Sequence, residues 1–222
     1  MATMTRHYDT LLVAACGASL IILSACGISL EAQNPRAILN QAVADFEAGR
    51  LSDAAAKFDE VAALVPSAAP QLWQRGIALY YVARYQDCRE MFELHRTVNP
   101  NDVENATWHF LCVARQESPA AARAALLPVG PDGRPPMVEI YQMYQGGLTP
   151  DEVMAAAARV AGGARARALF YAHLYIGLYY EVTGDEAEAR EHLTAAAAED
   201  YARAGGYMHT VARVHVDQLN GR

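Results

Sequence analysis

The residue types that carry acid–base, metal and nucleophilic chemistry are spread along this 222-residue chain without a motif that joins them. Seven histidines are present, but none belongs to an H-E-x-x-H pair, and no C-x-x-C exists to hold zinc. His209 and His215 are six residues apart, the wrong separation for one helical face. The G-x-S-x-G elbow, the P-loop and the G-x-G-x-x-G fingerprint are also missing. We therefore expect a non-enzyme with no catalytic residue, no metal site and no cofactor.

Cys26 is the cysteine whose neighbours indicate a chemical modification. It follows residues 23–25 (LSA) within the uncharged run 11–30. The stretch looks like a bacterial lipobox, in which the Cys is lipidated and becomes the mature N-terminus. Cys16 would leave an apolar segment of only about five residues, which is short for a signal peptide. The run also matches a membrane-spanning helix of roughly 20 residues, so an uncleaved inner-membrane signal anchor stays open as the alternative.

Lipidation would attach the chain to a membrane, because acyl chains bury their methylene groups in the bilayer. Gly27 follows the Cys, which in Gram-negative lipoproteins implies the outer membrane, with the protein facing the periplasm. Residues 1–26 are then a signal peptide with its lipobox, and residues 27–34 form a short tether. Cys88 and Cys112 could pair in an oxidising periplasm. Both fall at small buried helix positions, however, so we expect free core cysteines.

The composition favours helices and argues against nucleic-acid binding. Hydrophobic residues make up 53% and charged residues 19%, with a mean hydropathy of -0.01, which is typical of a folded chain. Alanine is abundant, and it orders in a helix without a side-chain entropy cost. The formal net charge is -7 and Lys57 is the only lysine, so the dense basic face that a nucleic acid needs is not expected.

The middle of the chain repeats with a constant period of 34 residues, which is the separation of Ala42 and Gly76 (76 minus 42). Small residues, aromatic residues, a turn position and a terminal proline all recur without a gap. The pairs are Ala42 with Gly76, Val43 with Ile77, Phe46 with Tyr80, Gly49 with Ala83, Ala54 with Cys88, Phe58 with Phe92 and Pro66 with Pro100. This pattern resembles the tetratricopeptide repeat (TPR). The resemblance implies an all-α fold, a TPR-type α-solenoid of antiparallel helix pairs with an irregular middle and a C-terminal capping helix.

Several of these residue types have a physical reason in such a fold. Ala42 and Gly76 are small, so that the two helices of a pair approach closely, and Gly49 accepts the left-handed backbone that ends a helix. Thr149 and Glu152 predict a capping box at a later helix start. The helical domain is expected over 35–219, with repeats at about 35–68 and 69–102, a degenerate repeat at 103–128, an irregular stretch at 129–163, a returning repeat at 164–200 and a cap at 206–219.

Beyond the generic repeat, residues 70–219 are similar to the NlpI family of bacterial TPR lipoproteins. The matching stretches occur in the family's order: RGIALYY at 75–81, NPND at 99–102, VEIY at 138–141 with GGL at 146–148, and FYAHLYIGLYYEVTGD at 170–185. The chain has fewer N-terminal repeats and a shorter C-terminal tail than the family pattern, so a homodimer stays an open alternative. The resemblance implies a non-catalytic envelope scaffold that docks peptidoglycan hydrolases or a processing protease.

In stacked TPRs the first helix of each pair lines a concave groove that holds the partner. Aromatic rings there supply large rigid contact area, and Arg supplies a forked donor. The resemblance places seven residues in this groove: Phe46, Trp73, Ile77, Tyr80, Tyr81, Leu111 and Arg115. The alternative for Trp73 and Tyr80 is simple packing against a neighbouring helix. Lys57 falls on the second helix of a pair, so the Lys/Asn clamp that holds C-terminal carboxylates in other TPR proteins is missing.

The leading expectation is therefore a lipid-anchored, non-catalytic TPR adaptor of the bacterial envelope. Its partner is a protein or peptide in the groove, and its N-terminal lipid or anchor binds the membrane. The alternative is a structural module, a TPR self-association domain on an uncleaved anchor. Neither alternative involves a nucleic acid or a cofactor.

Overall fold

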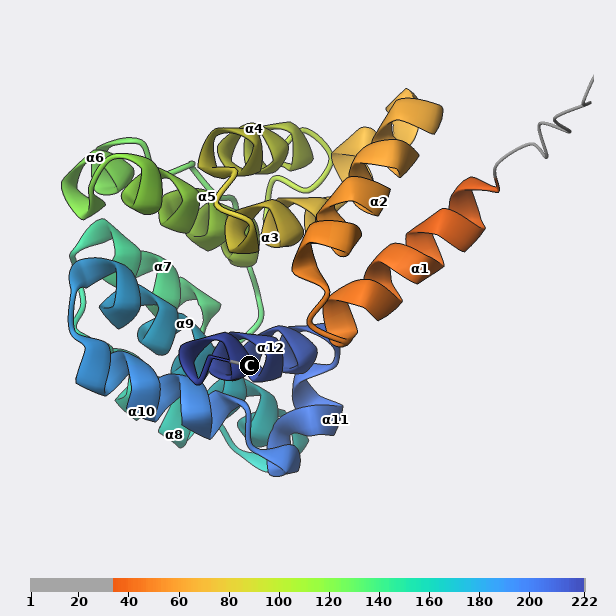
Figure 1. Ribbon diagram of the computed structural model, residues 1–222. Coiled ribbons are helices and arrows are strands. Elements are labelled where there is room, and N and C mark those ends of the chain that lie inside the picture. Colours follow the sequence, from red (N-terminus) through yellow and green to blue (C-terminus); the bar gives the residue numbers. More distant parts are fainter. Residues whose placement is uncertain (1–33, 222) are drawn as a thin grey trace, which may run out of the picture. The chain divides into compact units, whose positions relative to one another are not determined.

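Every regular element that the structure describes is helical (Figure 1). The structure is a computed structural model, and it describes residues 34–221. Within this range the prediction of an all-α fold is confirmed. The elements are α1 (Pro35–Glu47), α2 (Leu51–Leu64), η1 (Pro66–Gln71), α3 (Trp73–Tyr81), α4 (Tyr85–His95), α5 (Val103–Gln116), α6 (Pro119–Ala124), α7 (Met137–Gln145), α8 (Pro150–Arg159), η2 (Gly162–Ala164), α9 (Arg165–Thr183), α10 (Glu186–Ala196), η3 (Glu199–Tyr201), α11 (Ala202–Gly205) and α12 (Tyr207–Leu219), where η marks a 3-10 helix.

Side chains at the helix starts explain several of these boundaries. Asn34 Oδ1 accepts hydrogen bonds of 3.1 and 3.4 Å from the two backbone N–H groups that follow Pro35. At α8, Thr149 Oγ1 accepts a 3.3 Å bond from the Glu152 N–H, and the Glu152 carboxylate accepts a 2.8 Å bond from the Thr149 N–H. The capping box predicted there is confirmed, and it satisfies N–H groups that a helix start otherwise leaves open.

Two glycines allow the helices of a pair to approach closely. A Cβ atom on Gly76 of α3 would lie 2.7 Å from the Phe92 ring of α4. A Cβ atom on Gly177 of α9 would lie 2.7 Å from Leu193 Cγ of α10. The prediction that Gly76 is small for this reason is confirmed. In both helix pairs, α3–α4 and α9–α10, the glycine and the side chain that it faces are separated by the same number of residues.

The turns between paired helices use left-handed backbone. Gly49, between α1 and α2, has a φ of 75°, and Gly184, between α9 and α10, has a φ of 98°. The prediction for Gly49 is confirmed. The corresponding residue between α3 and α4 is Ala83, with a φ of 58°, and it is the only residue other than glycine in the described range with a positive φ.

The C-terminal helix α12 joins segments that are far apart in sequence. It packs against both α10 and α1, as Figure 1 shows around the C-terminus. The Tyr207 ring stacks on Phe46 of α1 with 5.9 Å between the ring centroids. Further along, Arg213 Nη2 donates a 2.9 Å hydrogen bond to the Glu47 carbonyl oxygen. The predicted cap at 206–219 is thus a helix that also covers the first helix of the described range.

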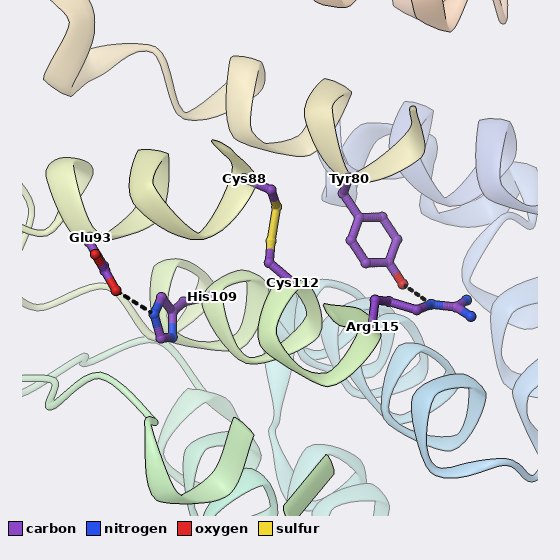
Figure 2. The surroundings of a disulfide bond; sticks show 6 residues. All are labelled: Tyr80, Cys88, Glu93, His109, Cys112 and Arg115. Atoms are coloured by element: carbon purple, nitrogen blue, oxygen red, sulfur yellow. Dashed lines mark hydrogen bonds and ion pairs between the residues drawn. A yellow bond between two sulfur atoms is a disulfide. The ribbon is translucent and has the colours of Figure 1, made fainter. Parts of the chain in front are cut away.

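A disulfide connects α4 with α5 through Cys88 and Cys112, whose Cα atoms are 5.9 Å apart (Figure 2). The expectation of free core cysteines is wrong. Both side chains are buried, as predicted, but α4 and α5 are adjacent and the two residues face each other from them. A sequence pattern that indicates burial says nothing about which buried neighbour a thiol meets.

Candidate functional site

Four of the seven predicted groove residues lie in the hydrophobic core, and three of them are completely buried. Phe46, Ile77 and Leu111 are each 0% exposed, so a partner has no access to them in this structure. The prediction that these three residues line an open groove is wrong. The physical reason is that other helices of the same chain cover this face: Tyr207 of α12 packs on Phe46, and α5 packs against α7 and α9.

Tyr80 and Arg115 belong to a polar network that connects α3, α5, α9 and α12. Arg115 Nε donates to the Tyr80 hydroxyl at 3.0 Å, as Figure 2 shows, and Arg115 Nη2 lies 2.8 Å from Glu181 Oε1. His215 Nε2 lies 3.2 Å from the same carboxylate, and its Nδ1 lies 2.9 Å from the Tyr81 hydroxyl. The predicted groove residues Tyr80, Tyr81 and Arg115 therefore hold helices together.

The electrostatics of the network are those of a stable structural contact. Burial acts to raise the pKa of Glu181, but the hydrogen bond from His215 and the charges of His215 and Arg115 outweigh burial, so the pKa is lowered. Burial, followed by the nearby Glu181 charge, raises the pKa of Tyr80 above its usual range. The phenol therefore stays protonated and the carboxylate stays charged near neutral pH, which suits the 3.4 Å hydrogen bond that the Tyr80 hydroxyl donates to Glu181 Oε2.

Trp73, the remaining predicted residue, is half-buried and lines a cavity of about 340 Å³. This volume lies at the lower end of the roughly 300–1,000 Å³ of small-molecule sites. We name it the α3–α5–α12 cavity after three of the helices that line it. Its aromatic walls are Trp73, Phe92, Trp108, Tyr171 and Tyr207. Its polar walls are His95, Asn99, Asp102, Glu104 and Asn105.

Three residues that line this cavity each carry one polar side-chain atom that is buried without a hydrogen-bond partner in the described part of the chain. These atoms are Asn105 Oδ1, Trp108 Nε1 and the Tyr207 hydroxyl. Asn105 is 4% exposed and Trp108 is 1% exposed. An unpaired buried polar group costs about 1–3 kcal/mol, so these three atoms lower the stability of the fold around the cavity.

Acidic groups supply the charge at one end of the cavity. Arg134 Nη1 lies 2.5 Å from Glu104 Oε1, and Arg134 Nη2 lies 2.6 Å from both Asp102 and Asp132. One guanidinium group thus forms ion pairs with three carboxylates. Burial, and then the neighbouring Asp102 charge, raise the pKa of Glu104, which reports a carboxylate in surroundings that disfavour its negative charge. Tyr175 donates a 2.7 Å bond to the same Glu104.

The histidines hydrogen-bond within the scaffold. His95 Nδ1 lies 2.7 Å from the Pro70 carbonyl oxygen, and His95 Nε2 lies 3.4 Å from the Asn99 amide nitrogen, so both ring nitrogens have neutral partners. His173 and His192 meet through their Nδ1 atoms at 3.1 Å. Within residues 34–221 no group of three or more His, Cys, Asp or Glu side chains is arranged to hold a metal ion.

Sequence reasoning found Trp73 but missed the residues opposite it. Tyr171 and Tyr207 come from α9 and α12, much later in the chain, and no local pattern brings them to α3. Asn105 offered a signal, because it is an amide among the apolar residues of α5. Trp108 offered another, because Trp73 and Trp108 are the only two tryptophans of the chain and both line the cavity.

No protein-family model matches this chain, and no curated protein matches it either. Among the helices of residues 34–221, none combines the length and the apolar character that crossing a membrane requires. The lipidation site predicted at Cys26 lies outside the described residues and stays a prediction.

Proposed function

We propose that this chain is a non-catalytic, lipid-anchored TPR adaptor of the bacterial envelope, which binds a protein or peptide partner through the α3–α5–α12 cavity. The observation that carries the proposal is the cavity itself. Its aromatic walls offer rigid contact area, and its lining also includes polar side chains such as Asn99 and Asn105. Such an arrangement suits the capture of a side chain, because rigid aromatic rings lose little conformational freedom when a partner packs on them.

Two observations support a TPR-type arrangement of the helices. The close contacts of Gly76 with Phe92 and of Gly177 with Leu193 occur at equal sequence separation in α3–α4 and α9–α10. The turns at Gly49 and Ala83, which are one repeat apart, share a left-handed backbone. Both agree with a repeated helix pair as the building unit.

The disulfide supports a location outside the cytoplasm. Structural disulfides persist in oxidising compartments such as the bacterial periplasm and are rare in reducing ones. Cys88 and Cys112 form one in the core, which fits the outer-membrane lipoprotein that the lipobox at Cys26 predicts. The resemblance to the NlpI family then suggests a peptidoglycan hydrolase or a processing protease as the partner.

Mass spectrometry of the protein extracted from membranes tests the anchor. A mature chain that begins at an acylated Cys26 is the expected product, and Cys26→Ser should leave the precursor unprocessed. An intact, unmodified N-terminus in the wild-type protein would support the alternative, a structural module on an uncleaved anchor.

Capture from envelope extract with tagged variants tests the adaptor role. We expect Trp73→Ala to lose proteins that the wild type retains, because it removes a wall of the cavity. Val138→Ala is the matched control, since Val138 is 51% exposed and does not line the cavity. Circular dichroism must show equal helicity in all three proteins. Equal recovery by Trp73→Ala and the wild type would contradict the proposal.

A further inference from the structure

His173 of α9 and His192 of α10 turn the same ring nitrogen toward each other. No sequence motif marks this pair, because its members come from two helices. Their Nδ1 atoms are 3.1 Å apart, whereas their ring centroids are 5.1 Å apart, so the two Nδ1 edges face each other. Two nitrogens bound to one tetrahedral Zn²⁺ ion, each at about 2.0–2.1 Å, lie about 3.3 Å apart. The pair is therefore already close to the separation that a shared metal ion requires.

The close packing of α9 on α10 holds the pair in place. Gly177 lies one helical turn after His173, and a Cβ atom on it would lie 2.7 Å from Cγ of Leu193, the residue after His192. The two helices therefore approach closely next to the histidines, and neither helix can shift without losing this contact. Both histidines are nonetheless partly exposed, so an ion from solvent can reach them.

The surroundings of the pair favour a cation. Glu188 Oε2 lies 4.0 Å from His192 Nε2, and the charges of Glu191 and Asp151 also act on His192. A carboxylate beside Nε2 favours the tautomer that carries its proton there, which leaves His192 Nδ1 with a free lone pair. The hydrogen bond between the rings then runs from the His173 Nδ1–H to His192 Nδ1.

We propose that His173 and His192 bind Zn²⁺ through their Nδ1 atoms. The ion replaces the hydrogen bond between the rings: the proton on His173 Nδ1 leaves to solvent, another is taken up from solvent at His173 Nε2, and both imidazoles stay neutral. Imidazole nitrogens suit Zn²⁺, whereas Mg²⁺ and Ca²⁺ prefer oxygen ligands. No third His, Cys, Asp or Glu within residues 34–221 completes the site, so water fills the other positions.

Isothermal titration calorimetry with Zn²⁺ tests the site on membrane-extracted protein without a histidine tag, at about pH 7.5, above the usual histidine pKa of about 6.5. We expect one ion per chain in the wild type. Binding should be at least about tenfold weaker with His173→Gln or His192→Gln, since each loses one of the two ligands. His209→Gln is the matched control, because its ring nitrogen lies 3.2 and 3.0 Å from the Ala197 and Ala198 carbonyl oxygens instead. No binding by the wild type, or equal affinity in the wild type and both pair variants, would overturn the inference.

Nitrogen resonances of the imidazole rings separate a metal site from a general effect on folding, and they need only the wild-type protein. Zn²⁺ should shift the Nδ1 resonances of His173 and His192 and convert His173 to the Nε2–H tautomer, while those of His95 stay in place. Equal shifts in all histidines, or an unchanged His173 tautomer, would overturn the inference. Neither measurement uses a partner protein, so its failure leaves the adaptor function standing.

Discussion

At the scale of single residues, the turn between α3 and α4 stores backbone strain at Ala83. Its φ of 58° lies in the left-handed region, where a Cβ atom crowds the following carbonyl at a cost of about 1–2 kcal/mol. Gly49, at the corresponding turn one repeat earlier, adopts φ 75° without that cost. The two turns therefore form a natural pair for experiment.

Ala83→Gly is expected to raise the free energy of unfolding by up to about 1 kcal/mol, since relief of strain outweighs the added freedom of the unfolded chain. Gly49→Ala should lower the free energy of unfolding by a similar amount, because the new Cβ atom would be strained in the left-handed backbone. No atom lies within 4 Å of that Cβ position, so new contacts cannot offset the strain. Urea denaturation monitored by circular dichroism measures both. A destabilised Ala83→Gly would show that the alanine side chain contributes contacts that matter more than its backbone.

At Gly76 the limit on a larger side chain is the space available between α3 and α4, and not the backbone conformation. A methyl group there would lie 2.7 Å from the Phe92 ring, so α3 and α4 must separate or the ring must move. Overpacking of this kind costs about 1–3 kcal/mol. We expect Gly76→Ala to lower the urea midpoint, and Phe92→Leu in the same chain to recover part of the loss. A double-mutant cycle with no coupling energy would contradict the contact.

At the scale of elements, the disulfide between α4 and α5 closes a loop with a sequence separation of 24 residues. In the chain-entropy description, a loop of this size contributes about 3 kcal/mol through the unfolded state. Cys88→Ala with Cys112→Ala should therefore lower the free energy of unfolding by about 2–4 kcal/mol. Dithiothreitol should lower the Tm of the wild type and leave that of the double variant unchanged. A wild-type Tm that is insensitive to reductant would contradict a stabilising bond.

The sequence predicted those elements that depend on neighbours within a few residues. The capping box at Thr149 and the left-handed turn at Gly49 are local, because the groups that satisfy them lie within one helical turn. The small residue at Gly76 followed from the internal repeat. The pairing of Cys88 with Cys112 did not follow, since it depends on how two helices are rotated against each other.

At the scale of the whole molecule, the long-range placement of α12 explains why the prediction for Phe46 was wrong. Phe46 has the spacing of an inward-facing helix residue, and it does face inward, but the space it faces is filled by Tyr207. The internal repeat carries no information about a helix that lies outside the repeated segment. For the same reason Tyr207 of α12 could not be chosen from sequence, whereas Trp73, on a helix of the repeat, could.

As the pH falls, the free energy of unfolding should decrease first through the protonation of histidines that are partly or fully buried. Protonation of carboxylates should follow at lower pH. Burial lowers the pKa of His109, His173 and His192, and for His173 the neighbouring His192 adds to the effect. Such a group contributes stability above its unfolded-state pKa of about 6.5, and this stability is lost as the pH falls through the folded-state pKa. Glu93, Asp132 and Glu181, whose pKa values are also lowered, follow only below about pH 4.5.

We therefore expect the free energy of unfolding to fall between pH 7.5 and pH 5.5, by up to about 1.4 kcal/mol for each of these histidines. The raised pKa of Glu104 acts in the opposite direction, so the histidine effect is tested by difference. His173→Gln with His192→Gln should flatten the dependence, because it removes two of the three groups. Urea denaturation at both pH values measures this, and an identical drop in the wild type and the variant would assign the acid sensitivity to other groups.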